Sequence, residues 1–81
     1  MQIEITYPQY RKYLNGRNFF KIISDKEWEE IQVMGSKYSI HQFKVNIFPD
    51  RNYLHDMTFD YEKNWVVIDE EEYEKLKLKI K

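Results

Sequence analysis

The sequence predicts an α+β domain, a mostly antiparallel sheet of five or six strands with two short helices packed on it. Two runs rich in aromatic and apolar residues flank Asn15-Gly16, which is typical of a β-hairpin. Two further segments, 18–31 and 64–76, each run from an apolar strand pattern into an acidic stretch that opens with a helix-capping residue. Eighty-one residues suit one domain, so we treat 1–81 as a single α+β unit.

The first part of the chain has strand patterns. Residues 2–7 alternate between polar and apolar side chains, which predicts a half-buried strand that ends at Pro8. Residues 10–14 and 17–23 should pair as a hairpin, because Asn-Gly favours a type I′ turn. The second of these strands is apolar at both odd and even positions, which suggests a strand covered on both faces.

The segment after this hairpin has the features of a helix. Ser24 and Glu27 match a capping box, in which each side chain bonds the other residue's backbone N–H. Trp28, Ile31 and Met34 follow at helical spacing. Gly35 suits the left-handed position just after a helix, so we expect a helix over 25–34.

A second, longer hairpin is predicted over residues 38–48 and 54–61, which flank the turn sequence 49–52. The preferred register places Phe43 opposite Phe59 and Val45 opposite Met57. That register separates a largely apolar face from a polar one, whereas a slip of one residue would mix them.

The last part of the chain predicts a strand at 65–68 and a helix from 70 to about 78, with Asp69 as its cap. The segment 76–81 also alternates with the period of a strand, so its structure stays open. The similarity of 18–31 to 64–76 hints at a duplicated strand-hairpin-helix unit. The alternative is that both segments use a common way of covering a sheet.

Composition limits the possible functions. The absence of cysteine excludes disulfides, thiolate metal sites and a cysteine nucleophile. No basic leader or long apolar run is present, so we expect a soluble cytoplasmic protein without membrane contact. Abundant Lys, Ile, Asn and Tyr, residues with AT-rich codons, suggest a bacterium of low GC content or one of its phages.

Catalytic and metal-binding patterns are weak. The predicted register separates His41 from His55 by roughly 20 Å, which is too far for one metal ion. The acids at 69–74 are explained by capping and the helix dipole. No nucleotide-binding or nucleophile-elbow motif occurs. We therefore expect no enzyme activity, no cofactor and no metal site.

The basic, tyrosine-rich hairpin is the candidate binding site, formed by Tyr10, Arg11, Lys12, Tyr13, Arg17 and Lys21. Tyrosine and arginine are enriched at protein-binding hot spots. The sequence thus favours a non-enzymatic protein-interaction module, inhibitory or regulatory, with a protein partner or a second copy of itself. The alternative is nucleic-acid binding through residues 10–21, because cations contact phosphates and aromatic rings stack on bases.

Overall fold

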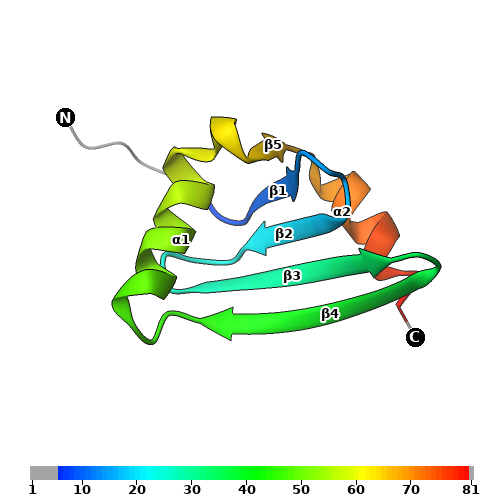
Figure 1. The fold of residues 1–81 in the computed structure, drawn as a ribbon, viewed down its shortest axis with the longest axis horizontal. Coiled ribbons are helices and arrows are strands. Elements are labelled where there is room, and N and C mark those ends of the chain that lie inside the picture. Colours follow the sequence, from blue (N-terminus) through cyan, green and yellow to red (C-terminus); the bar gives the residue numbers. More distant parts are fainter. Residues whose placement is uncertain (1–5, 81) are drawn as a thin grey trace.

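The computed structural model describes residues 6–80, apart from the Phe48 side chain. Five antiparallel strands form one sheet in the order β4-β3-β2-β1-β5, and two helices complete an α+β fold, as predicted (Figure 1). In chain order the elements are β1 (Gln9–Tyr13), β2 (Asn18–Ile22), β3 (Glu27–Met34), β4 (Lys37–Lys44), α1 (Phe48–Phe59), the 3-10 turn η1 (Tyr61–Lys63), β5 (Trp65–Val67) and α2 (Glu70–Lys77).

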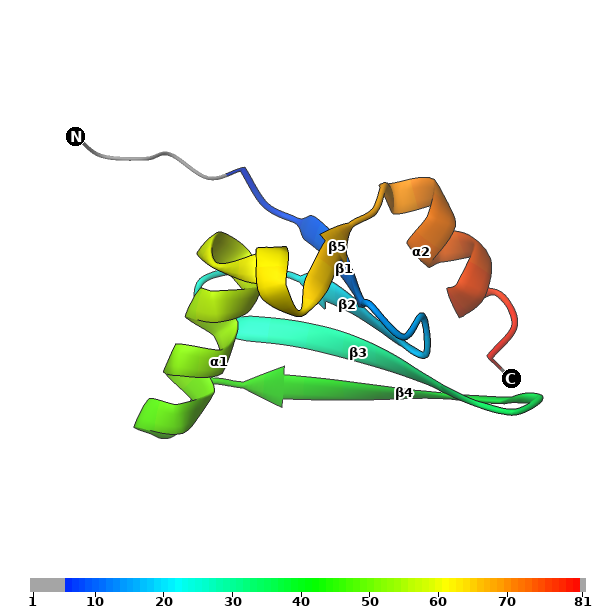
Figure 2. The same cartoon turned by 45° about the horizontal axis from the view of Figure 1, so that its top comes forward.

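The helices cover opposite faces of the sheet, near opposite ends of its strands (Figures 1 and 2). Neighbouring residues of a strand point to opposite faces, and Phe20 packs with α1 whereas Phe19 packs with α2. The core is therefore divided in two. The buried residues on the α1 side are Phe20, Ile22, Trp28, Leu54, Met57 and Trp65; those on the α2 side are Tyr10, Phe19, Ile31, Ile68 and Tyr73. The prediction that β2 is covered on both faces is confirmed.

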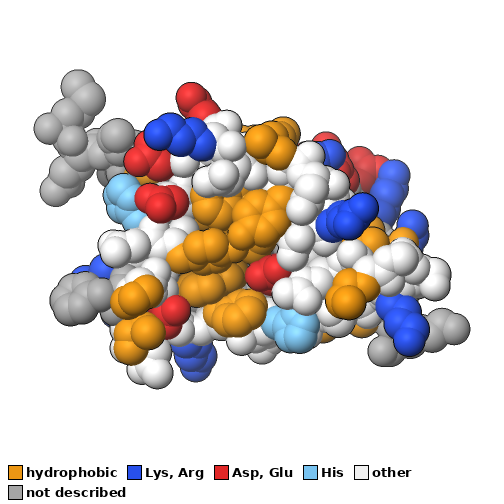
Figure 3. Space-filling view, in the orientation of Figure 1, with side chains coloured by type: hydrophobic (Ala, Val, Ile, Leu, Met, Phe, Trp, Pro, Cys, Tyr) orange, Lys and Arg blue, Asp and Glu red, His pale blue; other side chains and the backbone are white. Residues whose placement is uncertain are grey.

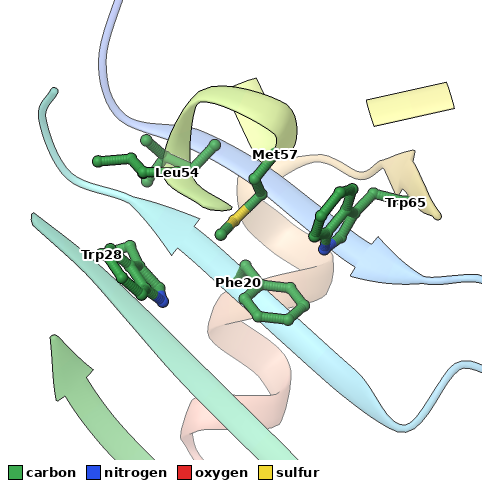
Figure 4. Close-up of a cluster of buried hydrophobic side chains, with 6 residues drawn as sticks. Phe20, Trp28, Leu54, Met57 and Trp65 are labelled. Carbon is green, nitrogen blue, oxygen red and sulfur yellow. The ribbon is translucent and has the colours of Figure 1, made fainter. Parts of the chain in front are cut away.

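Two indoles shape the α1-side cluster. Figure 4 shows the nitrogen edges of Trp28 and Trp65 turned towards Phe20. Both Nε1 atoms are enclosed and lack a conventional hydrogen-bond partner among the described residues. Trp65 meets the Phe20 ring edge-on, with centroids 6.2 Å apart and planes at 79°. An aromatic face accepts an N–H weakly, which accounts for the tolerance of this orphaned donor.

The first hairpin is confirmed, but its turn is not type I′. The strands pair from Gln9 with Ile22 to Lys12 with Phe19, and a four-residue loop joins them. Only Gly16 takes a positive φ there, of 72°, and its N–H donates to the Tyr13 carbonyl at 2.9 Å. A type I′ turn would need positive φ at both central residues.

The predicted helix at 25–34 is wrong, because the segment forms the inner strand β3, paired with both β2 and β4. Ser24 Oγ accepts from the Lys26 N–H inside a tight turn. Gly35, with φ 63°, opens a two-residue turn with Ser36. Only Gly35 has positive φ there, which suits a type II′ hairpin turn. Because residues 28–31 of β3 are buried on both faces of the sheet, its apolar residues do not alternate.

The predicted second hairpin is also wrong, because β4 pairs with β3 and residues 48–59 form helix α1. Phe43 lies opposite Trp28 instead of Phe59. Pro49 occupies the first turn of α1, where a missing N–H costs nothing. Leu54 and Met57 are buried against the sheet at helical spacing.

The C-terminal prediction is confirmed. Strand β5 leads to Asp69, whose Oδ1 accepts from the Glu72 N–H at 2.8 Å, and α2 begins there. Residues 78–79 form a turn, so the described part of 76–81 contains no strand. The duplication hypothesis fails, because the segment 18–31 runs into strand β3 whereas the segment 64–76 runs into helix α2. Of the strand predicted at 2–7, residues 2–5 lie outside the described residues, and Thr6 and Tyr7 are not in a strand.

Candidate protein-binding face

Strand alternation separates the six residues of the predicted binding hairpin. Arg11 and Tyr13 point to the α1 side, whereas Tyr10, Lys12 and Lys21 point to the α2 side. Arg17 lies exposed in the loop between them. The structure thus does not bring the six residues together as one patch.

Arg11 is buried, with 4% of its surface exposed. Its Nε donates to the Met57 carbonyl at 3.1 Å, its Nη2 donates to the Thr58 carbonyl at 3.3 Å, and its guanidinium lies 4.4 Å from the centre of the Tyr61 ring. Burial lowers the pKa of Arg11 from its ordinary value. Arg11 therefore caps the C-terminal end of α1, a role that sequence patterns did not indicate.

The two lysines of the predicted binding hairpin on the α2 side are paired within the fold. Lys12 Nζ lies 3.2 Å from Glu72 Oε2, and Lys21 Nζ lies 3.9 Å from Glu74 Oε1. Tyr10 is buried against the Tyr73 ring, with centroids 5.4 Å apart. These three residues help to attach α2 to the sheet.

Glu29 is the polar centre of that attachment. It is 3% exposed, and its Oε1 accepts from the Tyr73 hydroxyl at 2.8 Å and lies 3.3 Å from Lys77 Nζ. Burial alone would raise the pKa of Glu29, but the hydrogen bonds from Tyr73 and Lys77 hold it below its ordinary value. Burial and the bond to Glu29 raise the pKa of Tyr73.

In the described part of the chain, a helix covers the α1 side of the sheet only at one end, which leaves an open face beside α1. Figure 3 shows hydrophobic side chains gathered at the centre of this face, with acidic side chains at their margin. By strand alternation and ring contacts, we define the open face as Tyr13, Asn18, Glu30, Gln32, Met34, Ser39, His41, Phe43 and Tyr53.

Aromatic rings form one side of the open face. Tyr13 and Tyr53 share a hydroxyl–hydroxyl bond, and burial together with this bond raises the pKa of Tyr53. Phe43 is 38% exposed and stacks on Trp28, with centroids 5.1 Å apart and planes at 16°. The face therefore presents rigid rings that are anchored in the core below.

Glu30 is the buried acid of the open face. It is 8% exposed, and its Oε2 accepts from Asn18 Nδ2 at 2.7 Å and from Gln32 Nε2 at 3.1 Å. His41 lies opposite Glu30 on β4. The signal that could have located Glu30 here is Gly35-Ser36, a pair typical of two-residue hairpin turns.

Two shallow cavities lie beside this face and at the far end of α1. The first, of about 550 Å³, is lined by Tyr13, Tyr53 and Trp65 among others, and Asp56 is its only ionisable acid or base besides the tyrosines. The second, of about 350 Å³, lies between α1 and the β2–β3 turn and contains Asp25, Lys26, Arg51 and His55. Among the described residues that line the first cavity there is no serine, threonine or cysteine, and in the second the Thr58 hydroxyl already donates to the Leu54 carbonyl.

The two histidines lie on different elements, His41 on β4 and His55 on α1, and not on one sheet face as the predicted register required. Within residues 6–80 no three His, Asp or Glu side chains are grouped to hold a metal ion. In the same range, no helix is long and apolar enough to cross a bilayer.

Comparison with known proteins gives no relationship: no family model, curated protein or solved structure matches the chain.

Proposed function

We propose that this protein acts without catalysis, as an inhibitory or regulatory module in the cytoplasm that binds a protein partner through its open face. The observation that carries the proposal is an uncovered stretch of sheet with aromatic side chains at its surface. Phe43 and Met34 are 38% and 69% exposed on it. Rigid aromatic rings in a partly desolvated setting are the usual anchors of protein interfaces.

The anchored positions of these rings favour a binding role for the exposed aromatic surface. Phe43 stacks on buried Trp28, and Tyr13 is bonded to Tyr53, so their positions are set before a partner arrives. A preorganised surface loses little side-chain entropy on binding, which improves affinity.

The matched variants Met34→Ser and Leu78→Ser test the proposal. Both residues are exposed, at 69% and 85%, but Met34 lies on the open face and Leu78 follows α2 on the opposite side. Tagged protein should recover a stoichiometric partner from lysate of the source cells. The purified partner should then bind wild type and Leu78→Ser equally, and Met34→Ser more weakly. Equal binding by both variants would exclude the open face.

Self-association is tested separately, with the same two variants. Sedimentation of the purified chain shows whether a second copy occupies the open face. In that case Met34→Ser, and not Leu78→Ser, should shift the dimer towards monomer.

Nucleic-acid binding through residues 10–21 has less support. Lys12 and Lys21 face acids of α2, and Arg11 is buried. Binding through phosphate contacts would weaken steeply between low and moderate salt. We expect a mobility-shift assay to detect no complex even at low salt, whereas a complex lost on Arg17→Ala would revive this alternative.

A further inference from the structure

Glu29 and Glu30 are neighbours on β3 with opposite surroundings. Both are more than nine-tenths buried, but they point to opposite faces of the sheet. Glu29 has a cationic partner, because Lys77 Nζ lies 3.3 Å from it. Glu30 receives only two neutral amide donors, and no salt bridge to it forms among residues 6–80.

One oxygen of Glu30 remains available. The amides of Asn18 and Gln32 both bond Oε2, and Oε1 has no hydrogen bond within the described part of the chain. The enclosed polar atoms without partners there are the two indole nitrogens, so Glu30 Oε1 retains contact with solvent. A buried carboxylate without a counter-charge is unfavourable, and glutamine could accept the same two bonds without the charge.

No cation of residues 6–80 forms a salt bridge with Glu30, although exposed Arg17 lies in the loop beside Asn18 and Gln32. Arg11 bonds the end of α1, and Lys12 and Lys21 lie on the other face. Lys37 is on the same face but four residues along β4 from His41, about 13 Å away at the rise of a strand.

Aromatic rings lie near Glu30 on the open face and beneath it. Tyr53 is close enough for the charge of Glu30 to contribute to its raised pKa, after burial and the bond to Tyr13. Phe20 lies opposite Glu30 on β2, and Phe43 lies within ring contact of His41, 6.4 Å between centroids. Ring faces attract cations, and a planar guanidinium can stack on a ring while donating to a carboxylate.

We propose that the open face binds an arginine side chain of the protein partner, with Glu30 as its counter-charge and the neighbouring rings as its stacking surface. This inference rests on the proposed function and names the chemistry that the partner must present. Within residues 6–80 no cation pairs with the Glu30 charge, and the partner's arginine supplies the missing cation. Sites that break a local rule of stability in this way are commonly functional.

A short capped peptide, acetyl-Gly-Arg-Gly-Arg-Gly-amide, is the probe, and its citrulline counterpart is the uncharged control of almost equal shape. Each is titrated into the full chain by amide NMR. We expect saturable shifts at Glu30, His41 and Tyr53 with the arginine peptide alone. Glu30→Gln should weaken this binding at least about tenfold, because a charge-assisted bond is lost.

Glu29→Gln is the matched control. It removes the neighbouring carboxylate from the other face, so it should lower the melting temperature and leave peptide binding unchanged. Glu30→Gln should melt at or above the wild-type temperature. Equal binding of the citrulline peptide, unchanged binding by Glu30→Gln, or a Glu30→Gln melting loss as large as that of Glu29→Gln would overturn the inference.

The purified partner separates the two proposals. If its binding is weakened by Met34→Ser but not by Glu30→Gln, the open face is the interface and the arginine inference fails. If neither variant weakens its binding, the proposed function fails, whatever the peptide does.

Discussion

Arg11 supplies the positive charge that the last turn of α1 lacks. That turn contains no basic residue of its own, and the guanidinium reaches it from β1. The negative end of the helix dipole and two carbonyl oxygens compensate a charge that has no carboxylate partner among residues 6–80. Sequence patterns place Arg11 among surface cations, because nothing local indicates that a helix 46 residues away will end against it.

Arg11→Ala should lower the free energy of unfolding by ~1–3 kcal/mol, because it leaves buried carbonyl groups without donors. Arg11→Lys should recover little of this, since a single ammonium cannot reproduce the planar fork. Urea denaturation measures both, with exposed Arg17→Ala as control. If Arg11→Ala matched that control, the capping role would be refuted.

Glu29 makes the attachment of α2 sensitive to acid. The pKa of the Glu29 carboxyl is lower in the folded protein than in the unfolded chain. Glu29 therefore contributes its full stabilisation of the fold above the unfolded-state pKa, about 4.3, and this contribution is lost as pH falls through the folded-state pKa. Urea denaturation from pH 7 to pH 3 should show this loss in wild type. Glu29→Gln should be less stable at pH 7 and flatter with pH. Equal slopes would mean that another group carries the acid sensitivity.

Two similar cap sequences give different elements. Asp69 begins α2, whereas Ser24 lies in the turn before β3. The local free energy of a cap is only ~1 kcal/mol, and it is outweighed when β3 pairs with two strands and buries residues 28–31 on both faces. Helix α1 was missed for a related reason: residues 53–61 alternate like a strand, although Leu54 and Met57 also fit a helical face.

Asp69→Ala should therefore destabilise the protein by ~0.5–2 kcal/mol through the lost cap. Ser24→Ala should change stability by less than ~0.5 kcal/mol, because it removes only an exposed turn contact. Thermal melting monitored by circular dichroism compares them. Equal losses would indicate that residues 25–34 begin with a helix cap after all.

Trp28 joins β3 to α1, and its burial does not depend on whether the sequence predicts a helix or a strand there. It is 4% exposed and contacts the rings of Phe43 and Tyr53. Trp28→Ala should lower the free energy of unfolding by ~3–5 kcal/mol. Chemical denaturation tests this, and an unchanged midpoint would contradict the central place of Trp28 in the core.

At the scale of the whole molecule, the fold class followed from reliable local signals. Asn15-Gly16 indicated the first hairpin, and the cap at Asp69 indicated α2. The apolar residues at both odd and even positions of β2 indicated a sheet that is covered on both faces. The open face could not be predicted in the same way. Its residues come from four strands and a helix, and two of those elements, β3 and α1, had been assigned the wrong structure.

The topology explains why one face stays open. Helix α1 crosses one end of the sheet, and α2 lies on the reverse side (Figure 2). The long strands β3 and β4 extend beyond α1, and between residues 6 and 80 no second helix covers their α1-side residues. We therefore regard the open face as the part of the molecule left for a partner.

Site-specific photo-crosslinking tests that claim most directly. A benzophenone amino acid is placed at His41, on the open face, or at Lys44, which is also exposed but points to the α2 side of β4. In lysate of the source cells, irradiation should join one discrete partner to the His41 variant and none to the Lys44 variant. Crosslinks of equal yield at both positions, or at Lys44 alone, would contradict the open face as the binding surface.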